Sequence, residues 1–144
     1  MLIDALLETD VATVDRDHTA LRAARLMKEK NVGTVVVIDE KRRPVGMLTD
    51  RDIAVKIVGE GRSAETPVDE IMSHPVFAVS RDALVFDTLR EMARRHVHRM
   101  PVIDSETKAL IGVVHAEDAL LLLTSELANV AEVVANPRPT RPAK

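Results

Sequence analysis

Two stretches of this 144-residue chain carry residue types that hold phosphates and sugars. The first is GMLTDRD at 46–52, where an apolar strand is expected to turn into a helix. Gly46 would let the backbone approach a ligand, and a helix start offers free N–H groups and the positive end of its dipole to an anion. Thr49 adds a hydroxyl, and Asp52 could accept hydrogen bonds from the two hydroxyls of a ribose, as acids do in other nucleotide folds. The stretch therefore indicates a nucleotide-like ligand.

The same spacing is also typical of a helix cap. A threonine at the N-cap with an acid three residues later forms a capping box, which stabilises a helix by about 1 kcal/mol. The second stretch, GVVHAED at 112–118, has His115 in place of the threonine but keeps Asp118. A capping role would more readily preserve the cap than the third residue after it. The retained pair Asp52 and Asp118 therefore favours ligand binding.

Both stretches belong to a longer duplication. Residue 2 aligns with residue 67, an offset of 65, and one extra residue in the second copy then places residue 46 on residue 112, an offset of 66. Several matched positions are polar: Asp4/Asp69, Arg16/Arg81, Asp17/Asp82 and Asp39/Asp104. A unit this short, present twice, suggests that each copy covers the apolar face of the other. The cleft between two related halves is a natural ligand site.

Each copy predicts the same order: a short amphipathic lead, a brief strand, a helix, two strands paired as a hairpin, and a final helix. In the first copy these elements are expected at 2–7, 12–14, 20–27, 35–38, 45–48 and from 50 onward. In the second copy they are expected at 68–72, 77–79, 85–92, 100–103, 110–114 and from 116 onward. The predicted buried helix positions follow the i, i+3, i+4, i+7 spacing: Ala20, Ala23, Ala24 and Met27, and then Val85, Thr88, Leu89 and Met92. The fold class is therefore α/β, with two β-α-β-β-α units.

The end of the chain departs from this pattern. The last helix is longer than its counterpart, and its apolar residues recur at alternating steps of three and four, which is a heptad-like seam: Leu120, Leu123, Leu127, Val130 and Val134. Either the seam packs on its own domain or it forms a helix–helix contact in a dimer. Residues 137–144 include three prolines and are expected to be disordered.

Composition narrows the function classes. A net charge of −3 and two aromatic residues give no nucleic-acid surface, and no apolar run is long enough to span a membrane. The acidic start differs from a secretory signal, so the cytoplasm is expected. The chain has no cysteine, and its five histidines lack a tight ligand set, so we expect no metal. No nucleophile–base order, paired general acid and base, or phosphate-binding lysine loop indicates an enzyme.

Over about residues 2–125 the chain resembles a tandem pair of CBS domains, the Bateman module. The likeness rests on the 46–52 stretch, on VHRMPVID at 97–104, and on the strand-to-helix segments at 11–17 and 76–82. The resemblance implies two repeats, at 2–62 and 67–125, packed around a pseudo-twofold axis, with a C-terminal extension at 126–144. It also implies two clefts that commonly bind adenosine-containing ligands, and modules that often pair into dimers.

The resemblance also implies roles for individual residues. Asp52 and Asp118 would hold ribose, with Thr49 assisting in the first copy and His115 standing in its place in the second. His98 and Arg99 match the phosphate-contacting pair of the nucleotide-sensing gamma subunits of AMP-activated kinase. Their counterparts in the first copy are Gly33 and Thr34, which lack that charge. The first strand of the opposite repeat would line each adenine pocket, at Ala12 in one cleft and at Phe77 in the other.

Three functions are thus open. The first is a non-enzymatic sensor that binds AMP, ADP or ATP, or another adenosyl ligand such as S-adenosylmethionine or NAD, and signals to a separate regulated protein. The second is a ligand-free interaction module that forms a homodimer through the 120–134 seam. The third is an enzyme, for which the sequence offers no mechanism.

Overall fold

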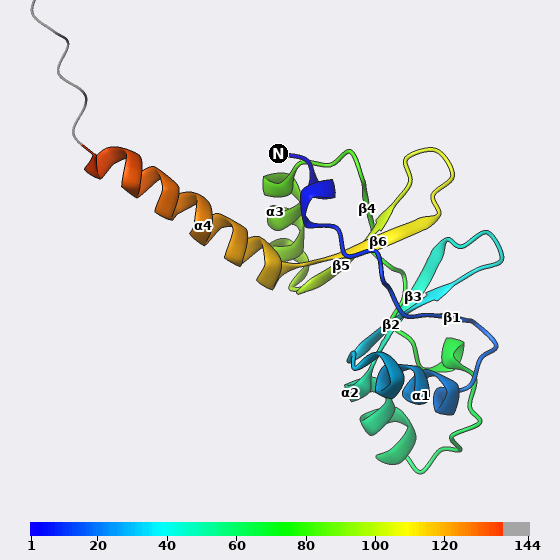
Figure 1. The fold of residues 1–144 in the computed structure, drawn as a ribbon. Coiled ribbons are helices and arrows are strands. Elements are labelled where there is room, and N and C mark those ends of the chain that lie inside the picture. The colour runs from blue at the N-terminus through cyan, green and yellow to red at the C-terminus, as the bar shows by residue number, and fades with distance from the viewer. Residues whose placement is uncertain (137–144) are drawn as a thin grey trace, which may run out of the picture.

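Two similar three-stranded sheets form the body of the protein (Figure 1). The structure is a computed structural model that describes residues 1–136. In each sheet the first strand pairs parallel to the second, and the second pairs antiparallel to the third. The predicted hairpins are therefore confirmed, and so is the α/β class.

In the first repeat the elements are, in order, η1 (Ile3–Leu6), β1 (Thr13–Asp15), α1 (Ala20–Lys30), β2 (Thr34–Ile38), β3 (Pro44–Thr49), α2 (Asp50–Ile53) and η2 (Ala54–Val58). In the second repeat they are η3 (Val68–Glu70), β4 (Val79–Ser80), α3 (Val85–Arg95), β5 (Arg99–Ile103), β6 (Leu110–His115) and α4 (Ala116–Ala135). The last helices differ most, because α2 is a single turn that continues as the π-helix η2, whereas α4 runs for 20 residues.

The helices lie where sequence and capping place them. Thr19 accepts a hydrogen bond from the backbone N–H of Arg22 at the start of α1, and Asn31 ends that helix in the left-handed conformation. His96 ends α3 in the same way. The predicted helix faces are buried, apart from two members that are half-buried, Ala24 and Leu89. Apolar periodicity thus gives the correct inner face of both helices.

Each lead segment packs in the core of the other repeat. Ile3 of η1 joins the second core, with Val85 and Met100, whereas Val68 of η3 and Ile71, which follows η3, join the first. Because the leads are exchanged, the predicted boundaries at 2–62 and 67–125 follow the duplication and not the packing. The exchange ties the repeats together, as the duplication predicts.

The exchanged contacts repeat around a pseudo-twofold axis. Leu2 bridges to Leu84 just as Pro67 bridges to Thr19. In the same way, Glu8 bridges to Val113 and Ser73 bridges to Met47. A third core of buried residues joins the two sheets and comes from β2 and β6: Val36, Ile38, Leu110 and Val113.

The matched aspartates Asp39 and Asp104 stabilise the hairpin turns of the two repeats. Asp39 accepts hydrogen bonds from the N–H groups of Arg43 and Lys41, and Asp104 accepts them from Thr107 and Glu106. These backbone bonds, led by those from Arg43 and Thr107, hold the pKa of each aspartate below its ordinary value. The Asp39/Asp104 match is therefore a hairpin-turn feature.

Helix α4 extends away from the body (Figure 1). Ala119 is its single buried residue, and the seam residues beyond it are mainly exposed: Leu120 by 65%, Leu127 by 69%, Val130 by 59% and Val134 by 79%. Packing of the whole seam on its own domain is therefore wrong. The predicted disorder of 137–144 lies outside the described residues.

Candidate ligand cleft between the repeats

A cavity of about 440 Å³ opens between the two repeats. From the first repeat it is lined by the segment before β1, the end of α1 and the start of β2; from the second, by β5 and β6. Its lining residues are Glu8, Asp10, Val11, Ala12, Lys30, Asn31, Val32, Gly33, Thr34, Val36, Met47, Arg99, Val113 and His115. Three predicted site residues thus meet here, namely Ala12, Arg99 and His115. We call this the Ala12 cleft.

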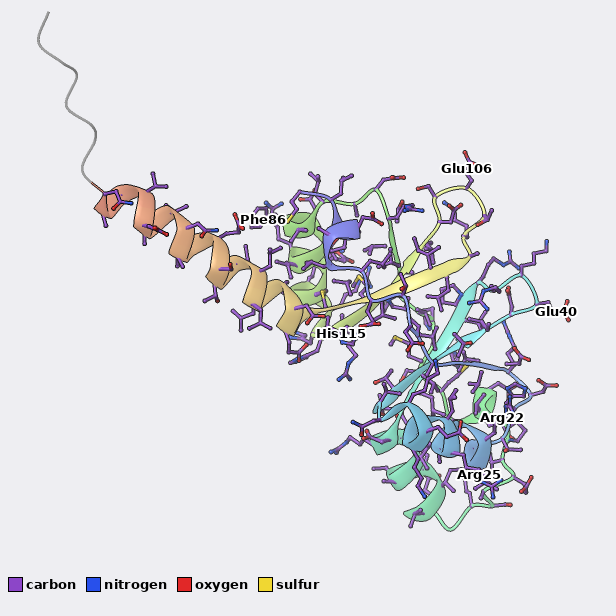
Figure 2. The ribbon with its side chains drawn as sticks, in the orientation of Figure 1. Arg22, Arg25, Glu40, Phe86, Glu106 and His115 are labelled. Carbon is purple, nitrogen blue, oxygen red and sulfur yellow. The ribbon has the colours of Figure 1, made fainter. Side chains whose placement is uncertain are left out.

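Arg99 crosses from one repeat to the other at this cleft. Its Nη1 donates to Thr34 Oγ1 at 3.0 Å, and its Nε donates to His115 Nδ1 at 3.2 Å. His115 ends β6 where α4 begins (Figure 2). The pairing of Arg99 with His115 across β5 and β6 sets this geometry. A guanidinium with exposed N–H groups in a cleft can bind a phosphate or a carboxylate.

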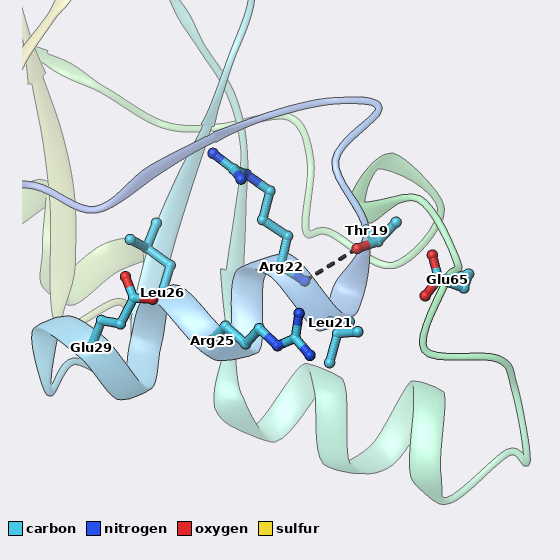
Figure 3. A pocket seen from close by; sticks show the side chains of 7 residues that line it. All are labelled: Thr19, Leu21, Arg22, Arg25, Leu26, Glu29 and Glu65. Atoms are coloured by element: carbon cyan, nitrogen blue, oxygen red, sulfur yellow. Dashed lines mark hydrogen bonds between the residues drawn. The ribbon is translucent and has the colours of Figure 1, made fainter.

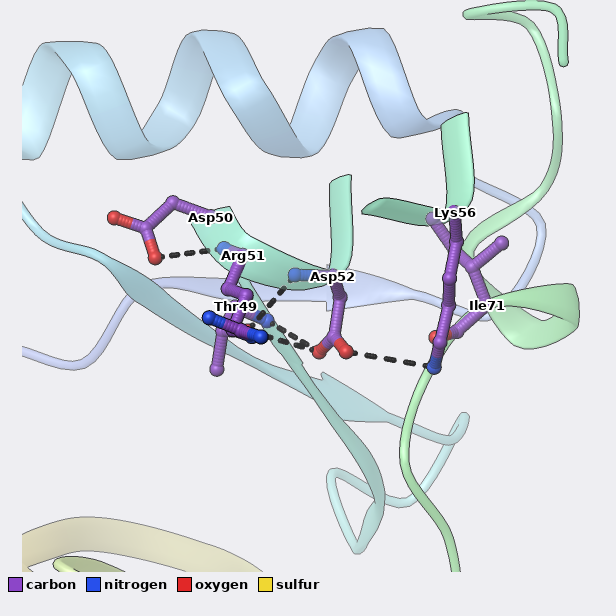
Figure 4. A network of polar contacts seen from close by, with 6 residues as sticks. All are labelled: Thr49, Asp50, Arg51, Asp52, Lys56 and Ile71. Atoms are coloured by element: carbon purple, nitrogen blue, oxygen red, sulfur yellow. Dashed lines mark hydrogen bonds and ion pairs between the residues drawn. The ribbon is translucent and has the colours of Figure 1, made fainter. Parts of the chain in front are cut away.

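Asp52 and Thr49 form the capping box that the sequence left as an alternative (Figure 4). The Asp52 carboxylate accepts hydrogen bonds from the Thr49 backbone N–H at 2.9 Å and from its hydroxyl at 3.0 Å, and the Thr49 hydroxyl accepts from Asp52 N at 3.1 Å. Lys56 Nζ lies 3.4 Å from Asp52 and donates to the Ile71 carbonyl at 2.8 Å. To hold a ribose, Asp52 would have to give up some of these bonds, and its ligand role stays a prediction.

Asp118 differs from Asp52 in its contacts. It is exposed in the first turn of α4, and its carboxylate makes no hydrogen bond or ion pair within residues 1–136. His115, at the N-cap position of α4, makes no side-chain capping bond. Capping therefore accounts for Asp52 but not for Asp118, and the role of Asp118 in a ligand site also stays a prediction.

His98 and Phe77 lie outside the Ala12 cleft. His98 is 80% exposed at the side chain and sits 3.6 Å from Glu117. The backbone N–H of Glu117 itself and then His98 hold the pKa of Glu117 below its ordinary value. His98 lies in the bend before β5, which begins at Arg99, and only Arg99 of this pair lines the cleft. Phe77 is 43% exposed. The Arg95 guanidinium lies over its ring, with Arg95 Cζ 3.5 Å from the ring centroid.

The sequence reading missed Thr34 and Lys30 as lining residues. Thr34 is the counterpart of Arg99 at the offset of 65, so the duplication itself was the signal that could have identified it. Lys30 lies at the end of α1 and pairs with Asp10 at 2.7 Å. That ion pair joins residues 20 positions apart in the chain, so no local sequence pattern predicts it.

Gly46 and Gly112 serve packing rather than ligand approach. A Cβ at Gly46 would lie 2.1 Å from Met72 Sδ, and a Cβ at Gly112 would lie 2.5 Å from the Glu8 carbonyl oxygen. In both cases the glycine makes room for the exchanged lead of the other repeat. The expectation that Gly46 admits a ligand is therefore wrong.

Two other features lie apart from the predicted residues. A hollow of about 350 Å³ beside α1 (Figure 3) is lined by Thr19, Leu21, Arg22, Arg25, Leu26, Glu29 and Glu65. Elsewhere, Asp15, Asp17 and His18 bring ligand atoms within 4.8 Å of one another, two of them on exposed residues. Exposed carboxylates commonly cluster without an ion, and the predicted absence of metal stays a prediction.

The family model for the CBS domain matches this chain twice, at residues 3–59 and 68–125. The chain belongs to the CBS domain family. It carries two CBS domains in tandem, as the resemblance implies, and CBS domain pairs are typically regulatory or sensor modules.

Known proteins agree with this assignment. The CBS domain-containing protein YhcV of Bacillus subtilis is 38% identical over 112 residues, which is 78% of each chain. The uncharacterized protein MK0525 of Methanopyrus kandleri is 34% identical over 124 residues, 85% of this chain but 63% of that protein. The CBS domain pair of protein MJ0100, solved with 5′-methylthioadenosine and S-adenosyl-L-methionine, has a TM-score of 0.76 and 24% identity, covering 88% of this chain and 98% of that one. This last likeness bears on the fold alone.

Among the described residues, no helix has the length and apolar character needed to cross a bilayer. This holds for α4 as well, although it has 20 residues.

Proposed function

We propose that this CBS domain pair is a non-enzymatic regulatory module that binds an adenine nucleotide, AMP, ADP or ATP, between its repeats. The observation that supports this most is the Ala12 cleft, whose volume of about 440 Å³ falls in the roughly 300–1,000 Å³ range of small-molecule sites. A cleft of this size with a bridging arginine suits a ligand that has an apolar base at one end and an anion at the other.

Each predicted residue takes a role in this proposal. At the Ala12 cleft, the small Ala12 leaves room for adenine, Arg99 and His115 bind phosphate, and Asp118 binds the ribose hydroxyls. His98 would assist Arg99 at the phosphate, on the side of Asp118. The pseudo-twofold counterpart, which we call the Phe77 cleft, would use the remaining residues: Thr49, Asp52 and Phe77.

Arg99 also offers a route from binding to regulation. Its bond to Thr34 joins the second repeat to the first at 3.0 Å. A phosphate that draws Arg99 away from Thr34 would change the relation of the two repeats, so the ligand would favour one arrangement over another. The regulated protein that responds would be a separate partner. The cytoplasm stays the predicted compartment.

Thermal unfolding with added ligands tests the proposal. Adenosine, AMP, ADP, ATP, S-adenosylmethionine and NAD are each added at millimolar concentration, with GTP as the control base. A ligand at 100 times its dissociation constant should stabilise the fold by about 2.7 kcal/mol. We expect AMP, ADP or ATP to give the largest shift and to remain unhydrolysed. A larger shift with S-adenosylmethionine or NAD would favour another adenosyl ligand, and no shift with any of them would reject the sensor.

The exposed seam on α4 favours a second function, homodimer formation. Seam residues repeat at heptad spacing, and four of the five are more than half exposed. A second copy presents the same pattern of leucines and valines. Glu126 lies beside the seam, and in a parallel pair its neighbour on the other helix, five residues further on, would be the uncharged Ala131. We propose that two copies pair through α4.

Replacing Leu127 with glutamate should dissociate this dimer. Each dimer would lose two buried leucines, worth about 1.5 kcal/mol or more apiece, so dissociation should become easier by about 100-fold. Leu121→Glu is the matched control, since both leucines are 69% exposed but Leu121 lies off the seam. Sedimentation should show a dimer for the parent and for Leu121→Glu, and a monomer for Leu127→Glu. A monomeric parent, or equal masses for the two variants, would reject α4 as the dimer contact.

A further inference from the structure

We propose that the two clefts are unequal: the Ala12 cleft is open in the free protein, and the Phe77 cleft is closed by the stack of Arg95 on Phe77. This inference rests on the proposed nucleotide binding. It adds that one nucleotide binds per chain, and it names the residue that prevents a second from binding.

The two clefts can be compared residue by residue because the repeats are related by the pseudo-twofold axis. At the offset of 65, Ala12 corresponds to Phe77 and Lys30 corresponds to Arg95. The backbone around both clefts is equivalent as well. Glu8 and Val113 exchange hydrogen bonds of 3.0 and 2.9 Å beside the first cleft, and their counterparts Ser73 and Met47 exchange bonds of 2.9 and 3.1 Å beside the second.

The Ala12 cleft is open because its side chains are small or held aside. Ala12 is 4% exposed, so it forms part of the wall rather than filling the space. Gly33 has no side chain, and a Cβ there would lie 3.0 Å from Asp50 Oδ2. Lys30 is drawn outward to Asp10, a residue whose side chain is 82% exposed. The volume between them is therefore left free.

The equivalent position in the second repeat is occupied. Phe77 replaces the methyl group of Ala12 with a ring, and the Arg95 guanidinium covers a face of that ring at 3.5 Å. Glu91, one turn earlier on α3, forms an ion pair with Arg95 and fixes it in this place. The hydrogen bond from Arg95 is the main cause that holds the pKa of Glu91 below its ordinary value. An adenine that stacks on this face of Phe77 must first displace Arg95.

The carboxylates of Asp52 and Asp118 also differ in whether other side chains already bind them. Asp52, which serves the Phe77 cleft in our proposal, is bonded to Thr49 and lies 3.4 Å from Lys56. Asp118, which serves the Ala12 cleft, has no such partner within residues 1–136, and the counterpart of Lys56 at the offset of 66 is the apolar Leu122. At the Phe77 cleft the ring face is covered and the carboxylate is engaged. At the Ala12 cleft the corresponding side chain is a methyl group, and the Asp118 carboxylate has no partner within residues 1–136.

Isothermal titration of the full chain with ATP tests the inference through stoichiometry. We expect one ATP per parent chain and two per Arg95→Ala chain, since that change uncovers the Phe77 ring. Arg94→Ala is the matched control, because Arg94 also pairs with Glu91, at 2.8 Å, but does not lie over Phe77. It should keep one site. Two equal sites in the parent, or one site in Arg95→Ala, would overturn the inference while leaving nucleotide binding intact.

A reciprocal change identifies which cleft is filled. Ala12→Phe places in the first repeat the ring that the second repeat carries, and it should abolish ATP binding by the parent chain. Since Ala12 is buried, a melting curve must show that the variant folds, and Asp118→Asn gives a surface alternative that should weaken ATP binding by about tenfold or more. ATP binding as tight as that of the parent, in a folded Ala12→Phe chain and in Asp118→Asn, would overturn the assignment of the open cleft. No ATP binding by the folded parent would instead reject the proposed function.

Discussion

Asp118→Ala should bind ATP about 10- to 150-fold more weakly than the parent chain. A hydrogen bond to a charged group contributes about 1.5–3 kcal/mol, so this factor corresponds to the net loss of one such bond between the ribose and the carboxylate. Because ribose is common to both ligands, adenosine should lose affinity by a similar factor. Titration calorimetry of the two ligands against parent and variant measures both losses.

Whether Asp118→Ala weakens or strengthens ATP binding shows if Asp118 contacts the ribose or only repels the phosphate. Removing a negative charge near a phosphate, with no contact to the ribose, would strengthen ATP binding and leave adenosine unchanged. Asp87→Ala is a suitable control, since Asp87 is an exposed acid in the first turn of α3. Unchanged or tighter ATP binding by Asp118→Ala would contradict the ribose assignment.

Gly112→Ala should be the most destabilising of the glycine substitutions between the repeats. The new methyl group would lie 2.4 Å from Leu7 Cδ1 and 2.5 Å from the Glu8 carbonyl oxygen. Glu8 is part of a backbone bridge to Val113 and has little room to move. Overpacking of this kind typically costs about 1–3 kcal/mol, and here it also pushes the exchanged lead out of its place.

Gly46→Ala is the natural comparison, because it is the same change at the pseudo-twofold position. Its methyl group would meet the Met72 side chain, with the nearest atom at 2.1 Å, and a flexible methionine can turn aside. Urea denaturation should therefore give a smaller loss in free energy of unfolding for Gly46→Ala. Equal losses, or a larger loss for Gly46→Ala, would contradict the exchanged-lead explanation of these glycines.

The sequence predicted the fold well where the signal is local. Apolar periodicity located α1 and α3, and turn residues located the hairpins. It did not predict that Ile3 packs beside Val85, because that contact joins residues far apart in the chain and depends on the exchange of leads. The misreading of Gly46 has the same origin, since the partner that requires a glycine is Met72 from the other repeat.

The candidate site was predicted in part. Ala12, Arg99 and His115 lie in one cleft, and the duplication was enough to pair their regions. The engagement of Asp52 with Lys56 and of Phe77 with Arg95 was not foreseen, although each involves charges near the site. The Asp52–Lys56 pair depends on side-chain rotamers, and the Phe77–Arg95 contact depends on how α3 lies against the segment before β4, which a residue pattern does not fix.

A crystal structure of the chain grown with ATP tests the central claim most directly. We predict nucleotide density in the Ala12 cleft, with phosphate at Arg99 and the ribose hydroxyls within hydrogen-bond distance of Asp118. An empty cleft at saturating ATP, or a nucleotide bound elsewhere with Asp118 facing solvent, would contradict it.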